Sequence, residues 1–316
     1  MSTASQQSTQ HILMVRPAHF RKNEQTAGNN HYQKESEYDD VLDRALAEFD
    51  GMVDGLRAHG VQVTVVEDDP STDTPDALFP NNWVSFHDDG KVGLYPMFAE
   101  NRRLERREEI LHDLVHQQGF EMTEVVDFTE FESHGVFLEG TGSIVLDRAH
   151  NKAYAALSAR TDKEAFVHFC EAFDMEGIVF EAFQTVEDDR LPIYHTNVMM
   201  AIGTSWAAVC LACMDHPEDQ ALVKSNLEAD GLAVVELSED QINQFAGNML
   251  EVKGSDGQTL IVMSRRAHQS LDADQRALLE TFGTIVSPDL DVIETCGGGS
   301  ARCMMAEVHL PQPTHA

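Results

Sequence analysis

Hydrophobic and polar positions along this chain follow a pattern that recurs roughly every 55 residues. Each unit opens with two apolar strands, continues with a charged amphipathic helix and ends in a short β-branched strand. One unit reads NNWVSFHDDGKVGLYPM, NRRLERREEILHDLVHQQG and MTEVVDF, with Asp-Gly at the predicted hairpin turn. The next three units open with LEGTGSIVLDRAHNKAYAAL, HTNVMMAIGTSWAAVCLACM and GNMLEVKGSDGQTLIVMS.

The first unit differs from the others, because a polar loop rich in Asn and Gln follows its strand HILMVRP. The last apolar segment, which contains Cys303, resembles an opening strand, so we expect it to complete this first unit. A ring closed in this way leaves no exposed sheet edge and places the helices outside the strands. The sequence therefore predicts an α/β fold of five pseudo-symmetric units, with a polar N-terminal tail at residues 1–10 and a single domain at residues 11–316.

The charge of the chain excludes several classes of partner. Asp and Glu number 54 against 22 Lys and Arg, which gives a formal net charge of −32. Nucleic acids and anionic membrane surfaces attract cations, so neither is an expected partner. An acidic surface of this kind suits a salt-rich cytoplasm, where salt screens the repulsion between carboxylates.

The N-terminus and the cysteines favour a cytoplasmic location. MSTASQQSTQ has neither the positive charge nor the apolar run of a secretory signal. The five cysteines are an odd number in a long chain, which is not typical of a disulfide framework. Cys210 and Cys213 form a C-x-x-C pair in a predicted buried strand, where they would point to opposite faces, so we expect no zinc there.

Five polar or reactive residues recur at the starts of the opening strands. They lie 53 to 57 residues apart and are Asn82, Glu139, His195, Asn248 and Cys303. If the opening strands converge on one axis, these side chains face one another. A thiol, an imidazole and a carboxylate brought together can attack an sp² carbon and transfer the protons that this attack requires. The alternatives are a packing cysteine after a glycine turn, a hydrogen-bonded core histidine and a structural Asn248.

Several motifs resemble those of the guanidino-group-modifying enzymes, which include arginine deiminases, dimethylargininases and amidinotransferases. These motifs are FPNNW, FLEGTGS, SART, HTNV and the terminal GGGSARCM. VRPAHF, NEQTAGNN and TCGGGSARCM resemble most closely the citrulline utilisation hydrolases, and the similarity extends from residue 11 to residue 311. The resemblance implies a five-bladed α/β propeller, the pentein fold, without a metal or an organic cofactor.

The resemblance also implies roles for four residues. Cys303 matches the nucleophile, His195 the general acid/base, and Glu139 the carboxylate that holds the substrate or the histidine. Arg160 matches an arginine that binds the substrate carboxylate in the deiminases, a role that suits a planar guanidinium. The expected partner is thus a small-molecule amino acid, and a homodimer stays open.

Two asparagines, Asn82 and Asn197, stand where the deiminases have aspartates. Paired aspartates neutralise a guanidinium, whereas an asparagine amide offers N–H donors and a carbonyl acceptor without charge. A ureido group is neutral and presents both kinds of group, and each mismatched buried polar group costs about 1–3 kcal/mol. We therefore expect a cysteine-dependent hydrolase that attacks the ureido carbon of citrulline through a covalent thioenzyme and releases ornithine, ammonia and carbon dioxide.

Other readings stay open at this point. An arginine deiminase or an amidinotransferase acting on a guanidino substrate is the main alternative, because Glu139 keeps one negative charge. A non-catalytic binding propeller is the third. The Asn-rich loop at residues 23–33 either closes over the site or is simply solvated. RRLERR, at residues 102–107, is expected on the outer face of a helix with carboxylate partners.

Overall fold

The computed structural model describes residues 5–313. Its strands form five three-stranded sheets of the same internal order and one separate hairpin. In each three-stranded sheet, one edge strand runs antiparallel to the middle strand and the other runs parallel to it. The sheets are β17 (Ala306–Glu307), β1 (His11–Arg16), β2 (Gln62–Glu67); β3 (Val84–Phe86), β4 (Lys91–Leu94), β5 (Glu124–Asp127); β6 (Val145–Asp147), β7 (Lys152–Ala156), β8 (Glu176–Phe180); β11 (Met200–Ile202), β12 (Trp206–Val209), β13 (Ala233–Glu236); and β14 (Leu250–Lys253), β15 (Thr259–Val262), β16 (Thr284–Val286). The hairpin is β9 (Phe183–Val186) with β10 (Asp189–Pro192).

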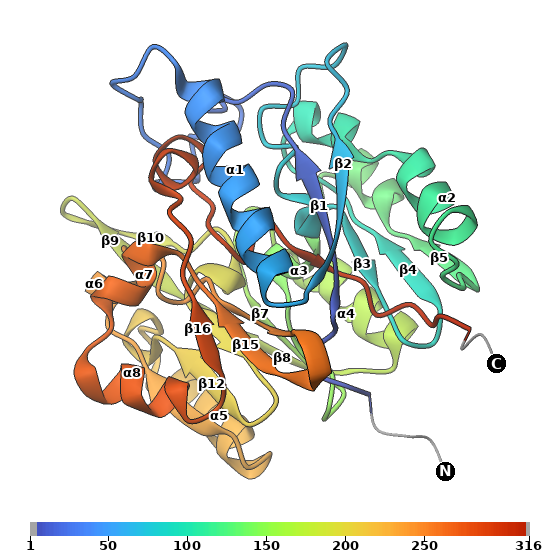
Figure 1. Cartoon of the computed structure of the whole chain (residues 1–316). Helices are drawn as coiled ribbons and strands as arrows, with labels where there is room; N and C mark the ends of the chain where they lie inside the picture. Colours follow the sequence, from blue (N-terminus) through green and yellow to red (C-terminus); the bar gives the residue numbers. More distant parts are fainter. Residues whose placement is uncertain (1–4, 314–316) are drawn as a thin grey trace.

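In every sheet a helix connects the middle strand to the parallel edge strand, because a parallel connection needs a crossover. These helices are α1 (Val41–Ala58), α2 (Glu108–His116), α4 (Lys163–Phe173), α5 (Pro217–Ala229) and α8 (Ala273–Glu280). Three further helices are shorter: α3 (Gly140–Ser143), α6 (Glu239–Ile242) and α7 (Arg265–Ser270). In α1, apolar residues spaced three or four apart are buried on one face. Figure 1 shows α2 and α8 on opposite sides of the molecule, with the strands between them.

The last strand of the chain completes the first sheet, as expected. β17 pairs antiparallel with β1, with Ile12 opposite Glu307. The antiparallel edge strands also contact one another from sheet to sheet, β17 with β3, β6 with β11, and β11 with β14. All residues of β3, β6 and β11 are buried. These short buried strands hold the residues just before them at the interior of the molecule.

The packed fold begins before residue 10, which the sequence placed at the end of a polar tail. Gln7 is buried, and its Nε2 donates hydrogen bonds to the carbonyls of Leu146, at 2.8 Å, and Ile202, at 3.1 Å. These two contacts join the N-terminal segment to the sheets of β6 and β11. The part of the expected tail around Gln7 is thus packed against the sheets, and residues 1–4 lie outside the described residues.

The predicted strand at the C-x-x-C pair, with its thiols on opposite faces, is wrong. β12 ends at Val209, and the following residues 211–213 form a 3₁₀ turn rather than more strand. The turn brings Sγ of Cys210 and Sγ of Cys213 to 3.0 Å, and both free thiols are buried. Among the described residues no third candidate ligand joins them in a metal-binding group.

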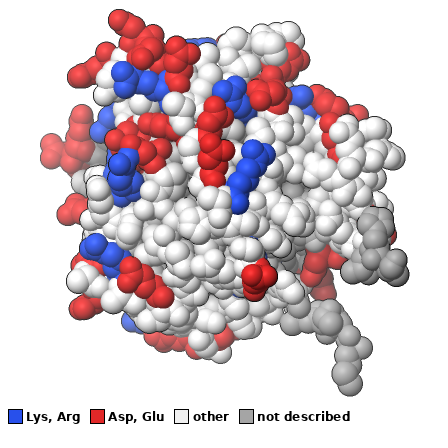
Figure 2. Space-filling model, viewed as in Figure 1, with Lys and Arg blue, Asp and Glu red and all other residues white. Residues whose placement is uncertain are grey.

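Acidic side chains outnumber basic ones, 54 to 22. In Figure 2 they spread over the upper and left parts of the visible face, with fewer Lys and Arg between them. Within residues 5–313, no helix combines the length and the apolar character that a membrane-spanning segment needs.

Candidate active site

Cys303 and His195 line one small cavity together with Asn82, Arg102 and Arg160. Its volume is about 10 Å³, which is close to the space of one water molecule and far below that of an amino acid. Three of the five residues expected to converge, Asn82, His195 and Cys303, thus line one closed cavity.

His195 and Glu139 form a buried hydrogen-bonded pair in this site. Nε2 of His195 lies 2.7 Å from Oε2 of Glu139, and the exposed fractions of the two residues are 1% and 0%. Oε1 of Glu139 accepts a hydrogen bond from the backbone N–H of Phe98 at 3.0 Å. Glu139 comes directly before α3, and His195 comes directly before a 3₁₀ turn at Thr196–Val198. These two helical turns lead into β6 and β11 and aim both side chains at the same point.

The surroundings of this pair keep Glu139 ionised and His195 neutral. Burial disfavours the charged carboxylate, but the Arg160 guanidinium and the hydrogen bond from His195 outweigh burial and hold the pKa of Glu139 well below its usual range. Burial lowers the pKa of His195 to about 4, against the raising effect of Glu139. Because an ionised carboxylate only accepts hydrogen bonds, Nε2 of His195 carries the proton and Nδ1 keeps its lone pair. The imidazole can thus act as a base through Nδ1 at neutral pH.

Two asparagine amides flank the thiol of Cys303. Nδ2 of Asn248 lies 3.2 Å from Sγ, and Nδ2 of Asn197 lies 3.5 Å from it, while Oδ1 of Asn197 is 3.9 Å away. The side chain of Asn248 also donates to the backbone carbonyl of Asn197 at 3.0 Å, which links the two amides. They can hydrogen-bond to the sulfur or to a group bound to it.

Cys303 lies in a turn at residues 301–304 rather than in the final strand, where the sequence placed it. The glycines before it let the chain pass close to other parts of the site. Gly298 has a φ of 62°, and a Cβ there would lie 2.6 Å from Nδ2 of Asn30. A Cβ on Gly299 would lie 2.9 Å from the ring of Phe79. Larger residues would therefore displace the wall of the cavity.

The Asn-rich loop at residues 23–33 closes over the site. Nε of Arg160 donates to Oδ1 of Asn29 at 2.9 Å, and Nε2 of Gln33 donates to the carbonyl of Gly297 at 2.9 Å. Nη1 of Arg160 also lies 3.4 Å from Oε2 of Glu139. In this closed form the guanidinium expected to bind a substrate carboxylate is engaged by the loop and by Glu139. It has to exchange these partners before it can bind a ligand.

Arg102 is a site residue that the sequence analysis missed. It was expected on the outer face of a helix, but residues 100–105 form a 3₁₀ turn before α2, and the side chain is 2% exposed. Its Nη1 donates to Oδ1 of Asn82 at 2.8 Å and lies 3.7 Å from Oε2 of Glu139. Its Nε and Nη2 form two hydrogen bonds of 2.9 Å with Glu105. An Arg and a Glu three residues apart are also typical of exposed helices, so the sequence contained no signal for burial.

Asp76 is the second missed residue, and it lines the same cavity. Its Oδ2 accepts hydrogen bonds from Nδ2 of Asn23, at 2.8 Å, and from Oγ1 of Thr26, at 3.3 Å, both in the 23–33 loop. Its Oδ1 has no hydrogen-bond partner among residues 5–313. Burial raises the pKa of Asp76, opposed by the charge of Arg102. The free oxygen can accept a hydrogen bond from a ligand.

The equal spacing of the candidate residues describes their positions only in part. Asn82 and Asn248 lie two residues before the first residue of their strands, and Cys303 lies three before. His195 lies five and Glu139 six residues before, because a helical turn intervenes in each case. The five residues reach one region, but they do not occupy one repeated structural position.

A possible metal-binding group lies away from this cavity. Within the described part of the chain, Asp147, His150 and Asp230 form a group whose ligand atoms lie within 4.8 Å of one another. Nζ of Lys152 already lies 2.6 Å from Oδ2 of Asp230 and supplies the positive charge there. The cavity lined by Cys303 and His195 contains no such group among the residues described.

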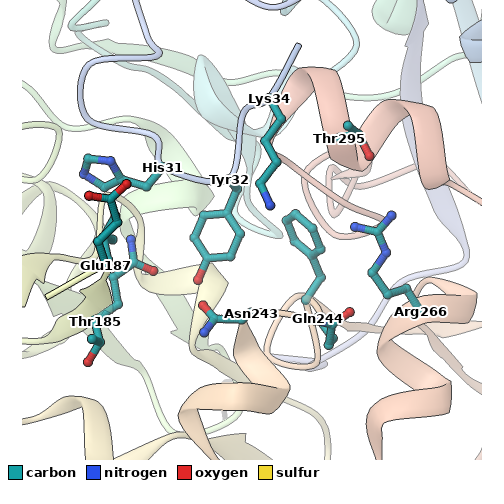
Figure 3. A pocket seen from close by; sticks show the side chains of 12 residues that line it. His31, Tyr32, Lys34, Thr185, Glu187, Asn243, Gln244, Arg266 and Thr295 are labelled. Carbon is teal, nitrogen blue, oxygen red and sulfur yellow. The ribbon is translucent and has the colours of Figure 1, made fainter. Parts of the chain in front are cut away.

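A larger pocket, of about 710 Å³, lies beside the closed loop. Lys34 and Arg266 lie on one side of Tyr32 in this pocket and Glu187 lies on the other, as Figure 3 shows. The ring of Tyr32 lies 6.0 Å from the ring of Tyr194, which lines the small closed cavity. Tyr32 in the open pocket and Tyr194 in the closed one are therefore neighbours.

Comparison with known proteins gives one family and several similar structures. The chain matches the family model described as N,N dimethylarginine dimethylhydrolase, eukaryotic, over residues 16–310. The substrate-bound N-terminal domain of ArgZ, an arginine dihydrolase from the ornithine-ammonia cycle in cyanobacteria, has a TM-score of 0.69 at 17% identity, covering 94% of this chain and 97% of that chain. AgrE in complex with ornithine and NAD+ has a TM-score of 0.70 at 19% identity, covering 97% of this chain but 40% of AgrE. A dimethylarginine dimethylaminohydrolase adduct with S-methyl-L-thiocitrulline has a TM-score of 0.63 at 17% identity, covering 94% of this chain and 98% of that one.

No curated protein sequence matches the chain significantly. At 17–19% identity, the structural similarities show the fold alone, a mixed α/β fold of the pentein type. The family match extends over nearly the whole chain and places it among enzymes rather than among non-catalytic binding proteins. The chain thus belongs to the N,N-dimethylarginine dimethylhydrolase family, within the guanidino-modifying hydrolases of the pentein superfamily.

Proposed function

We propose that this enzyme hydrolyses the ureido C–N bond of citrulline and releases ornithine, ammonia and carbon dioxide. The observation that carries the proposal is the pair of neutral amides, Asn248 and Asn197, whose Nδ2 atoms lie 3.2 and 3.5 Å from the sulfur of Cys303. A neutral ureido group offers a carbonyl oxygen to their N–H donors and N–H groups to an amide oxygen. A guanidinium has no acceptor for these donors, so it would leave them unsatisfied.

Cys303 is the proposed nucleophile and His195 the proposed acid/base. Nδ1 of neutral His195 takes the thiol proton, and the thiolate adds to the ureido carbon. The imidazolium then gives its proton to the departing Nδ of ornithine, which breaks the C–N bond and leaves a carbamoyl-thioenzyme. His195 next removes a proton from water, which attacks the carbonyl carbon. The carbamate released decomposes to ammonia and carbon dioxide, and Cys303 regains its proton.

Glu139 is the proposed positioning carboxylate for this acid/base. Its hydrogen bond to Nε2, at 2.7 Å, keeps the proton on that nitrogen and leaves Nδ1 for chemistry. It also stabilises the imidazolium that forms when the thiol is deprotonated. Arg102, 3.7 Å from Glu139, helps to keep the carboxylate ionised.

The remaining site residues are proposed to hold the amino acid. Arg160 would bind the substrate carboxylate after it releases Asn29, and the free Oδ1 of Asp76 would accept a hydrogen bond from the α-amino group. Asn82, fixed by Arg102 at 2.8 Å, would contact the ureido group beside His195.

We also propose that the five sheets close into a pseudo-symmetric five-bladed propeller around this site. The support is threefold. All five sheets have the same order, β17 completes the first of them, and antiparallel edge strands of different sheets contact one another. Such closure places the segments before these edge strands around one axis, which would explain why distant segments supply one site.

A guanidino substrate is the second candidate, and Asp76 is the observation that favours it. The buried carboxylates of Asp76 and Glu139 could balance a guanidinium. The similar structures include an arginine dihydrolase and a dimethylarginine dimethylaminohydrolase. Arginine, or its dimethylated form, is therefore the substrate class to set against citrulline.

A mass-resolved product assay with L-citrulline, L-arginine and N,N-dimethyl-L-arginine tests the proposal. Ornithine and ammonia should form from citrulline, while the two guanidino compounds stay unchanged. In the matched variant Asn197→Asp, activity on citrulline should fall by about 10²-fold or more, because a carboxylate would face the ureido oxygen. Citrulline formed from arginine or from dimethylarginine by the natural protein would overturn the choice of substrate.

The Cys303→Ser protein tests the nucleophile separately. Turnover should be abolished, and the melting temperature should stay within a few degrees of the natural protein, because the substitution conserves shape. A packing cysteine would give the opposite result, with activity retained and a large fall in melting temperature.

A further inference from the structure

A second small cavity lies at the other end of the strands that position the catalytic residues. It is lined by residues that follow β3, β6 and β17, among them His87, Arg148 and His309, and its volume is about 50 Å³. The catalytic residues Glu139 and Cys303 instead precede β6 and β17. The cavity is therefore separate from the site of the proposed reaction.

Arg148 enters this cavity with an unusual lack of partners. The residue is 4% exposed, yet its guanidinium forms no hydrogen bond with any residue of the 5–313 range, and its Nε is fully buried. The nearest carboxylate atom, Oε1 of Glu307, lies 4.0 Å from Nε. An Nε–H donor buried without an acceptor carries a desolvation cost. Burial accordingly lowers the pKa of Arg148, despite the opposing effect of Glu307.

His309 adds a second polar atom without a partner, which is a donor in the tautomer that carries the proton on Nε2. Its side chain is 5% exposed, and Nε2 has no hydrogen-bond partner within the described residues. Nε2 lies 3.7 Å from Oε1 of Glu307, which is too far for a normal hydrogen bond. Burial lowers the pKa of His309 to about 4, so the ring is neutral at physiological pH and can donate one N–H.

The buried charges at this cavity leave one positive charge without a buried carboxylate. Glu307 accepts a hydrogen bond of 2.6 Å from Nη2 of Arg302, so two buried guanidinium groups share this one carboxylate. Two exposed carboxylates also line the cavity: Asp89 is paired with Lys91 at 3.1 Å, and the charge of Asp88 acts on Arg148 and His309 from the solvent-exposed side. Among the buried groups alone, one negative charge is lacking.

We propose that this cavity binds a small inorganic monoanion of the size of chloride, held by Arg148 and His309. One negative charge balances the two buried guanidinium groups and Glu307, and the ion accepts hydrogen bonds from the buried N–H donors that have no partner within residues 5–313. The space, about 50 Å³, exceeds what one water needs and accepts a spherical ion. A divalent anion would leave excess negative charge beside Asp88 and Glu307. The ion joins the ends of β3, β6 and β17, and thus ties three of the sheets together.

Crystals of the full chain grown in sodium bromide test the site directly. An anomalous bromide peak within hydrogen-bonding distance of the Arg148 guanidinium and of Nε2 of His309 is the expected result. Ordered water alone in the cavity, or a rotated Asp88 carboxylate on Arg148, would overturn the proposal.

Thermal unfolding tests whether the ion stabilises the protein in solution. Sodium chloride is exchanged for sodium gluconate at constant ionic strength, so that general screening does not change. The melting temperature of the natural protein should rise with chloride concentration, and this rise should be lost in Arg148→Gln. Arg265→Gln is the matched control. Arg265, at the start of α7, forms an exposed ion pair with Asp289, so its substitution should leave the rise intact.

Asp88→Asn keeps the test decisive if the Arg148 variant does not fold. This substitution removes a negative charge that would repel the bound chloride. The melting temperature should still rise with chloride, and the midpoint of the rise should move to a lower chloride concentration. If Asp88 is instead the natural counter-ion of Arg148, the substitution should lower the melting temperature in gluconate, and the proposal fails. A bromide peak without any chloride response would mark an adventitious ion only and would equally overturn it.

Discussion

Gly142 lies against two side chains of the candidate site. A Cβ at this position would lie 2.4 Å from Nδ2 of Asn82 and 2.7 Å from Nδ1 of His195. Nδ1 is the nitrogen to which we assign the proton transfers. The lack of a side chain at residue 142 therefore leaves room for the amide and the imidazole to lie side by side.

The substitution Gly142→Ala should impair catalysis much more than folding. The added methyl group pushes the imidazole away from its position, and misplacement of this size costs on the order of 10²-fold in kcat. The measurement is kcat and KM for citrulline together with the melting temperature. Gly51→Ala in α1 is the matched control, because nothing lies within 4 Å of its Cβ position, and it should keep full activity. Equal activity of the two variants would contradict the role given to Nδ1.

The lowered pKa of His195 determines the pH dependence of the reaction. The free enzyme needs this imidazole neutral, and its pKa is lowered from 6.5 to about 4. The acid limb of kcat/KM should therefore lie near pH 4 rather than near pH 6.5. Glu139 raises this pKa, so Glu139→Gln should move the limb to lower pH as well as reduce kcat.

The lowered pKa of His195 also affects the stability of the fold, and the direction of this effect provides a control for the kinetic measurement. Between pH 6.5 and about 4 the unfolded chain binds a proton at this histidine and the folded chain does not. The free energy of unfolding therefore falls as the pH falls through this range. Melting temperatures measured at each pH separate this loss from the kinetic limb. A limb near pH 6.5 in fully folded protein would refute the neutral-base assignment.

At the scale of elements, the 23–33 loop decides whether the site is open. Its Asn29 accepts a hydrogen bond from Arg160. Asn30 and Gln33 donate hydrogen bonds to the backbone carbonyls of Gly298 and Gly297. The cavity beneath it, at about 10 Å³, does not admit an amino acid, so the loop has to move before substrate binds. Its displacement would join the closed cavity to the open pocket beside Tyr32, which Figure 3 shows.

Gln33→Ala should loosen the loop without touching the reacting atoms. It removes two hydrogen bonds, from Nε2 to the carbonyl of Gly297 at 2.9 Å and from Oγ1 of Thr26 to Oε1 at 3.1 Å. A net loss of about 2 kcal/mol predicts roughly 30-fold faster amide hydrogen exchange at residues 23–33. Hydrogen exchange followed by mass spectrometry measures this change, and citrulline should restore protection. Unchanged exchange in the variant would indicate that other contacts hold the loop closed.

At the scale of the whole molecule, the net charge of −32 is the main electrostatic feature. Many of the ion pairs lie at exposed positions, such as Arg44 with Asp40 and Arg21 with Asp73. Such pairs contribute little to stability and are weakened by salt. The repulsion among the surplus carboxylates is weakened as well, and it involves many more charges.

The melting temperature should therefore rise by several degrees between 0.1 and 2 M potassium gluconate at pH 7, because salt screens the net repulsion. Gluconate keeps this effect separate from chloride binding at Arg148. Differential scanning fluorimetry measures the change. A fall in melting temperature with salt would mean that the ion pairs outweigh the surplus negative charge.

The sequence alone determined the repeated order of strands and helices and the segments that supply Glu139, His195 and Cys303. These features depend on local periodicity and on the register of residues before buried strands, which neighbouring residues specify. It also indicated that the last strand closes the first sheet, because that strand has no other partner in the repeat.

Only the tertiary structure decided that Arg102 and Asp76 are buried and that the thiols of Cys210 and Cys213 lie in contact. It also decided that Nε of Arg148 has no hydrogen-bond partner among the described residues. Each depends on contacts between segments distant in the chain or on the residue at which a strand ends. Arg102 looks like an exposed helical arginine until the 100–105 turn carries it to Asn82. A local pattern specifies which element forms, whereas the charges and partners around a side chain arise from the packing of several elements.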